Sequence, residues 1–192
     1  RIDAKAVRRV TLLMTPFDPR KYASHAALLF EFDGAGAVDP DTGRPISGIV
    51  ISAEARIREG EAFNFSQGLS GKSPLIHVVS TWDDYKQSLL EVWKDKLERF
   101  VLRVSPAEAR GALEAGLEVA LRADRTARYR LLDASCATQA VDILNAGLSP
   151  ERRIQRKWFF GLILRPGVTV AGWLPGFLTR RGYVEERLPD LP

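Results

Sequence analysis

The sequence predicts an α+β fold. Segments with the composition of β-strands occupy the N-terminal half and return in the C-terminal third, whereas two segments with helical periodicity lie together in the middle. Strands and helices do not alternate regularly, as they do in parallel βαβ folds. The chain has 192 residues, of which 45% are hydrophobic and 27% charged, as in a globular protein. We therefore expect a single domain over residues 1–192, with residues 149–192 as a basic C-terminal extension of it.

Strands are predicted throughout the N-terminal half of the chain. Five segments there are β-branched or apolar enough to form them: residues 8–13, 24–32, 46–57, 62–65 and 75–80. Residues 33–45 are rich in Gly, Asp and Pro and predict an exposed hairpin loop between the second and third of these strands.

The middle of the chain changes to helical patterns. Residues 83–96 have the charged and apolar mixture of a helix, and residues 99–104 alternate as a strand does. The next segment has clear signals for the N-terminus of a helix: Ser105 can cap it, Pro106 suits its first turn and Glu108 completes a capping box. Its buried face is predicted from four residues at helical spacing: Leu113, Leu117, Ala120 and Leu121.

A third helix is predicted to begin at Cys136. Asp133 and Ser135, just before it, are both good capping residues. Asn145 and Gly147 are typical of its C-terminal end. Four residues keep helical spacing and form its predicted apolar face: Ala137, Ala140, Val141 and Leu144.

The C-terminal third carries most of the excess positive charge. The whole chain has a formal net charge of +4, whereas residues 151–187 hold eight basic and three acidic residues, a net charge of +5. Such a stretch suits either an anionic membrane or polymer, or simply a solvated surface. No zinc-finger, basic-heptad or RNA-binding signature accompanies the charge, so nucleic acid is not an expected partner.

Apolar residues are also concentrated in this third. Residues 158–164 (WFFGLIL) are predicted to form one buried strand, because seven residues are too short to span a bilayer. Trp173 and Phe177 precede Arg180 and Arg181, an arrangement that suits a surface resting on anionic lipid. The alternative is that the two aromatic residues pack into the core and the two arginines are solvated.

Few residues are available for catalysis. With one cysteine, Cys136, and two histidines, His25 and His77, the chain holds no disulfide framework, multi-cysteine zinc site or His-rich metal centre. We expect no metal and no cofactor. The residues do not indicate an oligomeric state.

Cys136 is the candidate nucleophile. A thiol in the first turn of a helix meets unpaired backbone N–H groups and the positive end of the helix dipole, which lower its pKa and favour the thiolate. The same amides can stabilise the oxyanion that forms when a thiolate attacks a carbonyl. His25, at the start of an apolar strand, is a candidate base. A lone cysteine is also commonly a small buried hydrophobe, and this interpretation stays open.

The segments around these two residues carry a family resemblance. His25 lies in YASHAALLF and Cys136 in YRLLDASCATQA, with RFVLRVSPAEAR between them. Over residues 10–144 this order resembles the bacterial DUF4105 domain, the N-terminal periplasmic domain also found in Lnb-type lipoprotein N-acyltransferases. It is more distantly similar to circularly permuted papain-like proteins of the NlpC/P60 group, in which a strand His precedes a helix-start Cys. The resemblance implies a papain-like antiparallel sheet packed against helices, in a periplasmic or otherwise extracytoplasmic protein.

The resemblance also bears on the rest of the site. Residues 63–66 (FNFS) resemble the family's aromatic-Asp-aromatic-Gly string, which gives Asn64 the position of the group that orients His25. His77 is the alternative for that role. The family has Asn immediately before the nucleophile, whereas this chain has Ser135, which can still cap the helix.

The expected function is cysteine-dependent acyl transfer, or amide or ester hydrolysis, through a thioester intermediate. Cys136 would be the nucleophile, His25 the base and Asn64 the orienting group. The resemblance implies a cell-envelope substrate, either a peptidoglycan-type peptide or a lipoprotein acyl chain. Two alternatives remain: a catalytically inactive envelope-binding or scaffolding domain, and a structural domain in which Cys136 is merely buried.

Overall fold

The computed structural model describes most of the chain. It covers residues 1–16, 24–56, 68, 70–89, 96–122, 126–155, 157–159, 162–164 and 168–191. Asn64 and the strand predicted at residues 62–65 lie outside these ranges.

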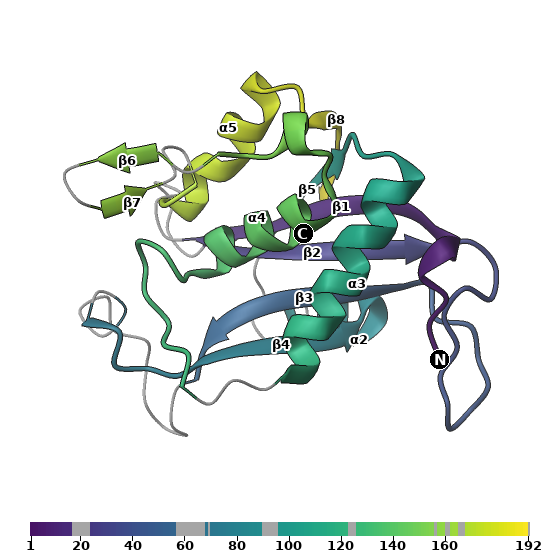
Figure 1. The fold of residues 1–192 in the computed structure, drawn as a ribbon. Coiled ribbons are helices and arrows are strands. Elements are labelled where there is room, and N and C mark those ends of the chain that lie inside the picture. The colour runs from purple at the N-terminus through teal and green to yellow at the C-terminus, as the bar shows by residue number, and fades with distance from the viewer. Residues whose placement is uncertain are drawn as a thin grey trace.

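Six strands form one antiparallel sheet, in the spatial order β4-β3-β2-β1-β5-β8 (Figure 1). Their bounds are Val7–Pro16 (β1), Ser24–Phe32 (β2), Gly48–Ala55 (β3), Leu75–Thr81 (β4), Leu97–Leu102 (β5) and Val184–Leu191 (β8). The predicted α+β class and antiparallel sheet are confirmed. β2 has the predicted bounds, and the ends of β1, β3, β4 and β5 differ from the predicted ones by three residues or fewer. β8 was not predicted.

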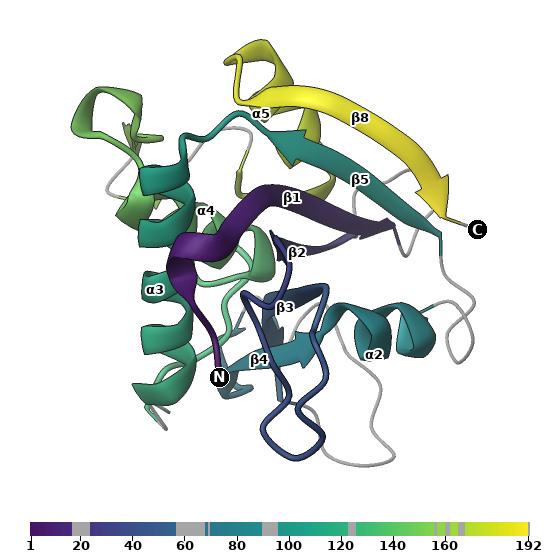
Figure 2. The same cartoon turned by 90° about the vertical axis from the view of Figure 1, so that its right-hand side faces the viewer.

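Helices cover both faces of this sheet. They are α2 (Trp82–Gln87), α3 (Pro106–Arg122), α4 (Cys136–Gly147) and α5 (Leu174–Arg180), with short 3₁₀ turns at Ala4–Ala6, Pro150–Arg152 and Ala171–Trp173. Figure 2 shows α3 and α4 on one side of the sheet and α2 on the other. The helix predicted over residues 83–96 begins one residue earlier, at Trp82, where Thr81 caps it, and its α-helical part ends at Gln87.

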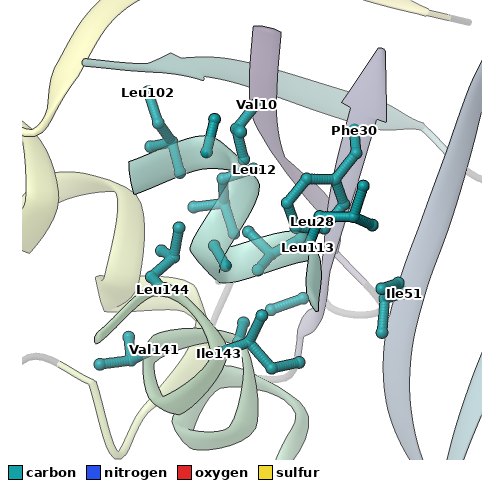
Figure 3. Packing of buried hydrophobic residues seen from close by; sticks show 14 of the residues in the cluster. Val10, Leu12, Leu28, Phe30, Ile51, Leu102, Leu113, Val141, Ile143 and Leu144 are labelled. Carbon is teal, nitrogen blue, oxygen red and sulfur yellow. The ribbon is translucent and has the colours of Figure 1, made fainter. Parts of the chain in front are cut away.

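Alternation along the central strands divides the core into two layers. Leu12 and Leu28 belong to the larger cluster, which packs beneath α3 and α4 together with Leu113 (Figure 3). Their neighbours Leu13 and Leu29 belong to the cluster on the opposite face. Successive residues of a strand point to opposite faces, so an unbroken apolar run is what a sheet covered on both sides requires.

The ends of the two long helices follow the predicted capping chemistry. At α3, the backbone N–H of Ser105 donates to Glu108 Oε2 at 2.8 Å, and the N–H of Glu108 donates to Ser105 Oγ at 3.3 Å. At α4, Ser135 and Thr138 form a second capping box. These reciprocal bonds satisfy backbone donors that a helix start otherwise leaves free.

The buried face of α3 agrees with the predicted one in part. Leu113 is buried and Leu117 packs against the core as predicted, whereas Leu121 is 84% exposed, and the small residues Ala109, Ala112 and Gly116 are buried as well. The small residues face α4, where a Cβ on Gly147 would lie 2.5 Å from the backbone nitrogen of Ala112. Close approach of the two helix backbones therefore requires small residues on the side of α3 that faces α4.

The C-terminal third corrects a second prediction. Residues 158–164 do not form one strand: β6 (Lys157–Phe159) and β7 (Leu162–Leu164) pair with each other in a separate two-stranded sheet. Two residues join the strands, a length that favours local hairpin pairing. Figure 1 shows this hairpin extending away from the main sheet. After it, Leu174 and Leu178 of α5 are fully buried, while Trp173 is 53% exposed.

Candidate active site

Cys136 is the first residue of α4 and lies against the sheet. The Ser135 side chain accepts a hydrogen bond from the Thr138 N–H, and the Ser135 N–H donates to Thr138 Oγ1 at 2.8 Å. This capping box fixes where the helix begins, and with it the position of the thiol at the positive end of the helix dipole. Cys136 is only 4% exposed.

The sheet opens at the point where the thiol meets it. The β1–β2 pairing continues to Pro16↔Ser24 and the β3–β4 pairing to Ala55↔Leu75, but the β2–β3 pairing stops at Ala27↔Ser52. The start of β2 and the end of β3 therefore separate, as Figure 1 shows.

Backbone groups at the start of β2 contact the sulfur. The Cys136 thiol donates to the carbonyl oxygen of Ser24 at 3.8 Å, and the backbone N–H of Ala26 donates to the sulfur. The opening between the strands thus gives the thiol a polar environment although it is buried.

His25 is hydrogen-bonded to the same thiol, although 111 positions separate the two residues. Burial raises the pKa of Cys136, but the hydrogen bond and positive charge of His25 outweigh burial, so the thiol pKa falls below its usual value. Burial lowers the pKa of His25, but its hydrogen bond to Cys136, the thiolate charge and the charge of Glu54 raise it overall. Both shifts favour a thiolate beside an imidazolium.

Tyr129 also reaches the sulfur, a contact that the sequence did not reveal. Its hydroxyl donates to Cys136 Sγ at 3.8 Å, and the side chain is 93% buried beside Ala53 and Leu75. Burial and the thiolate charge raise the pKa of Tyr129, so it stays a neutral donor. The contact depends on a backbone pairing that no local pattern indicates: the Tyr129 N–H donates to the Ser73 carbonyl at 2.9 Å.

The group that orients His25 was predicted to be Asn64, with His77 as the alternative. Asn64 lies outside the described residues, so its role stays a prediction. His77, on β4, has its Nε2 3.2 Å from Oε1 of Gln139, one turn after Cys136 on α4. Burial lowers the pKa of His77, which indicates a neutral ring.

Glu54 is a further residue beside His25 that sequence reasoning missed. Its Oε1 lies 3.9 Å from Nε2 of His25, and the Ser52 hydroxyl donates to that same oxygen at 2.8 Å. The sequence did contain one signal for this residue: Ser52 and Glu54 are polar residues near the end of an otherwise apolar strand, and their spacing places them on the same face of β3.

The described part of the chain contains no cluster of three or more His, Cys, Asp or Glu residues placed to hold a metal ion. Within the same residues, no helix combines the length and the apolar character needed to cross a bilayer. What the site does contain is a thiol, an imidazole ring and hydrogen-bond donors to the sulfur.

Comparisons with known proteins add a family. The sequence model of the Lnb N-terminal periplasmic domain matches residues 1–160. No curated protein matches the chain. Among solved structures, the crystal structure of the Type VI secretion system effector TseH is similar over 88% of this chain and 89% of that one, with a TM-score of 0.41 and 13% identity. At that distance the likeness does not bear on function.

The family match confirms the Lnb-type part of the predicted resemblance. The family's description as a periplasmic domain supports a location outside the cytoplasm. Because the match extends over 160 of the 192 residues, the chain belongs to the Lnb N-terminal periplasmic domain family.

Proposed function

We propose that the chain is a cysteine-dependent acyl-transfer enzyme of the permuted papain-like type. The observation that carries this proposal is the hydrogen-bonded Cys136–His25 pair, whose pKa values are shifted in opposite directions at the start of a helix. A buried thiol that only fills space has no need of an imidazole partner, a backbone N–H donor and a tyrosine hydroxyl.

The reaction proceeds in two halves. The Cys136 thiolate attacks the carbonyl carbon of an amide or ester, and the electron pair moves to the carbonyl oxygen, near the N–H groups at the start of α4. The oxyanion then collapses and the bond to the leaving group breaks, while the His25 imidazolium gives that group its proton. A thioester and a neutral imidazole remain. Water or an amine next attacks the thioester, His25 takes the proton of the attacking group, and the thiolate leaves.

The papain-like assignment is supported by the order of the parts. A strand histidine precedes a cysteine at a helix start, and the helix packs on an antiparallel sheet that carries the histidine. Ser135 stands where the family has Asn, and its capping box supplies what the helix start requires of that position. An active site is therefore compatible with this departure.

The proposed substrate is a cell-envelope peptide or a lipoprotein acyl chain, in keeping with the family's periplasmic description. We further propose peripheral contact with anionic membrane through the C-terminal third. Trp173 is 53% exposed, and both Arg180 and Arg181 are exposed beyond it. Aromatic residues and nearby cations favour the interface of an anionic bilayer.

The test uses the single cysteine of the chain, because iodoacetamide alkylation then reports on Cys136 alone. We expect rapid alkylation below pH 7 that His25→Ala slows, and acylation of Cys136 by a p-nitrophenyl ester, detected by intact-protein mass spectrometry and absent from Cys136→Ser. A control measurement of thermal unfolding should show both variants folded. Alkylation that requires denaturant in the wild-type protein would favour the inactive scaffolding domain instead.

A further inference from the structure

Glu54 occupies a defined place beside His25. Continuing the Ala27↔Ser52 register by two residues brings Glu54 opposite His25, where the two strands separate. Across this opening, Glu54 Oε1 lies 3.9 Å from His25 Nε2. The distance is that of an ion pair rather than a direct hydrogen bond.

The carboxylate is held in this place by its own strand. The Ser52 hydroxyl donates to Glu54 Oε1 at 2.8 Å, and Ser52 is only 4% exposed. The oxygen that faces His25 is thus the one that Ser52 fixes. In the described part of the chain, Glu54 forms its ion pair with His25, and no Lys or Arg forms a salt bridge with it.

We infer that Glu54, held by Ser52, is the residue that orients His25 and stabilises its imidazolium form. Glu54 is a positioning residue, because it acts through His25. This inference rests on the proposed function and assigns to Glu54 the role that the family resemblance implies for Asn64. A carboxylate also performs that role differently from an amide, since its charge favours the imidazolium directly.

Among the described residues, the charged groups that act on His25 are Cys136, which faces it from α4, and Glu54, which faces it from β3. Tyr129 and Tyr85 of α2 interact with Cys136 and Glu54. Burial raises the pKa of both tyrosines, so they stay neutral. Among the described residues, Cys136 and Glu54 are therefore the two groups whose replacement should change the titration of His25.

The chain offers a direct measurement, because it has only two histidines. In NMR spectra their ring signals can be assigned with His77→Gln, and the pKa of His25 can be read from a pH titration. Glu54→Gln removes a negative charge that favours the imidazolium, so the pKa of His25 should fall. The Glu54 side chain is 42% exposed and water screens the pair. We therefore expect a fall of about 0.5–1 unit.

Two further variants and one control variant test the same assignment. Glu54→Asp keeps the charge and should restore part of the shift, and Ser52→Ala should lower the His25 pKa by less than Glu54→Gln does. Asp133→Asn is the matched control: Asp133 lies three residues before Cys136 but pairs with Arg130, its Oδ2 2.7 Å from Nη2. It should leave the His25 pKa unchanged.

The outcomes separate this inference from the proposed function. If the His25 pKa is unaffected by Cys136→Ser, the thiolate–imidazolium pair is absent and the proposed function fails. If Cys136→Ser lowers it but Glu54→Gln does not, or does so no more than Asp133→Asn, the assignment of Glu54 is overturned and the proposed function stands.

Discussion

Replacing Tyr129 by Phe tests how the buried thiol becomes reactive. The change removes one hydroxyl, which donates to Cys136 Sγ at 3.8 Å, and keeps the ring that packs with Ala53 and Leu75. Because the O–H stabilises the thiolate more than the thiol, its loss should raise the pKa of Cys136.

The size of this effect follows from the geometry. A hydrogen bond to a charged group contributes about 1.5–3 kcal/mol. An O···S distance of 3.8 Å is long even for sulfur, so the lower end of that range applies. Since one pKa unit corresponds to about 1.4 kcal/mol, we expect the pKa of Cys136 to rise by about 1 unit.

The assay is the pH dependence of iodoacetamide alkylation, which reports on the only cysteine in the chain. The acidic midpoint of the profile should move to higher pH in Tyr129→Phe. The midpoint is the quantity to compare, because the nucleophilicity of a thiolate rises about threefold for each unit by which its pKa rises. This gain offsets part of the alkylation rate that is lost at a fixed pH when less thiolate is present.

Tyr183→Phe is the matched control, because the Tyr183 hydroxyl donates to the carbonyl of Arg152, away from the thiol. Its midpoint should equal that of the wild type. A Tyr129→Phe midpoint within about 0.3 unit of wild type, in a folded protein, would refute the argument that this hydroxyl stabilises the thiolate.

Three further predictions concern stability and membrane contact. Gly147→Ala should lower the free energy of unfolding by about 1–3 kcal/mol, because a Cβ at this position would meet the backbone of α3. The control is Gly176→Ala on α5, where a Cβ would have only the end of an arginine side chain at 3.4 Å, so the melting temperature should stay unchanged or rise. Thermal unfolding measures both variants. Ser135→Ala removes the cap of α4 and should cost about 1 kcal/mol in denaturant unfolding, while Ser135→Asn keeps a capping side chain and should cost less. In liposome sedimentation, anionic vesicles should retain more protein than neutral ones, and Arg180→Glu with Arg181→Glu should abolish the difference; equal recovery on both vesicle types would contradict the proposed membrane contact.

Local chemistry was enough to predict several features of the fold. The Ser105–Glu108 capping box and the start of a helix at Cys136 were predicted from adjacent residues and are confirmed. β2 has the predicted bounds for the same reason, since its apolar residues are followed by Asp33 and Gly34, which favour a turn. Caps, turns and apolar runs act within a few residues, so a sequence read along its length contains them.

Features that depend on contact between distant segments were not predictable in this way. Leu121 fits the helical spacing of α3 but is exposed, because close packing against Gly147 turns the small residues toward α4. Residues 158–164 have the composition of one strand, yet local pairing divides them between β6 and β7.

The site combines both kinds of information. The sequence by itself marked His25 and Cys136, because a histidine opening a strand and a cysteine opening a helix are visible in residue type and local pattern. Only the tertiary structure decided that Tyr129 donates to the thiol and that Glu54 faces His25. Those contacts arise where β2 and β3 separate, and a register between strands is set by packing across the whole sheet rather than by any short segment.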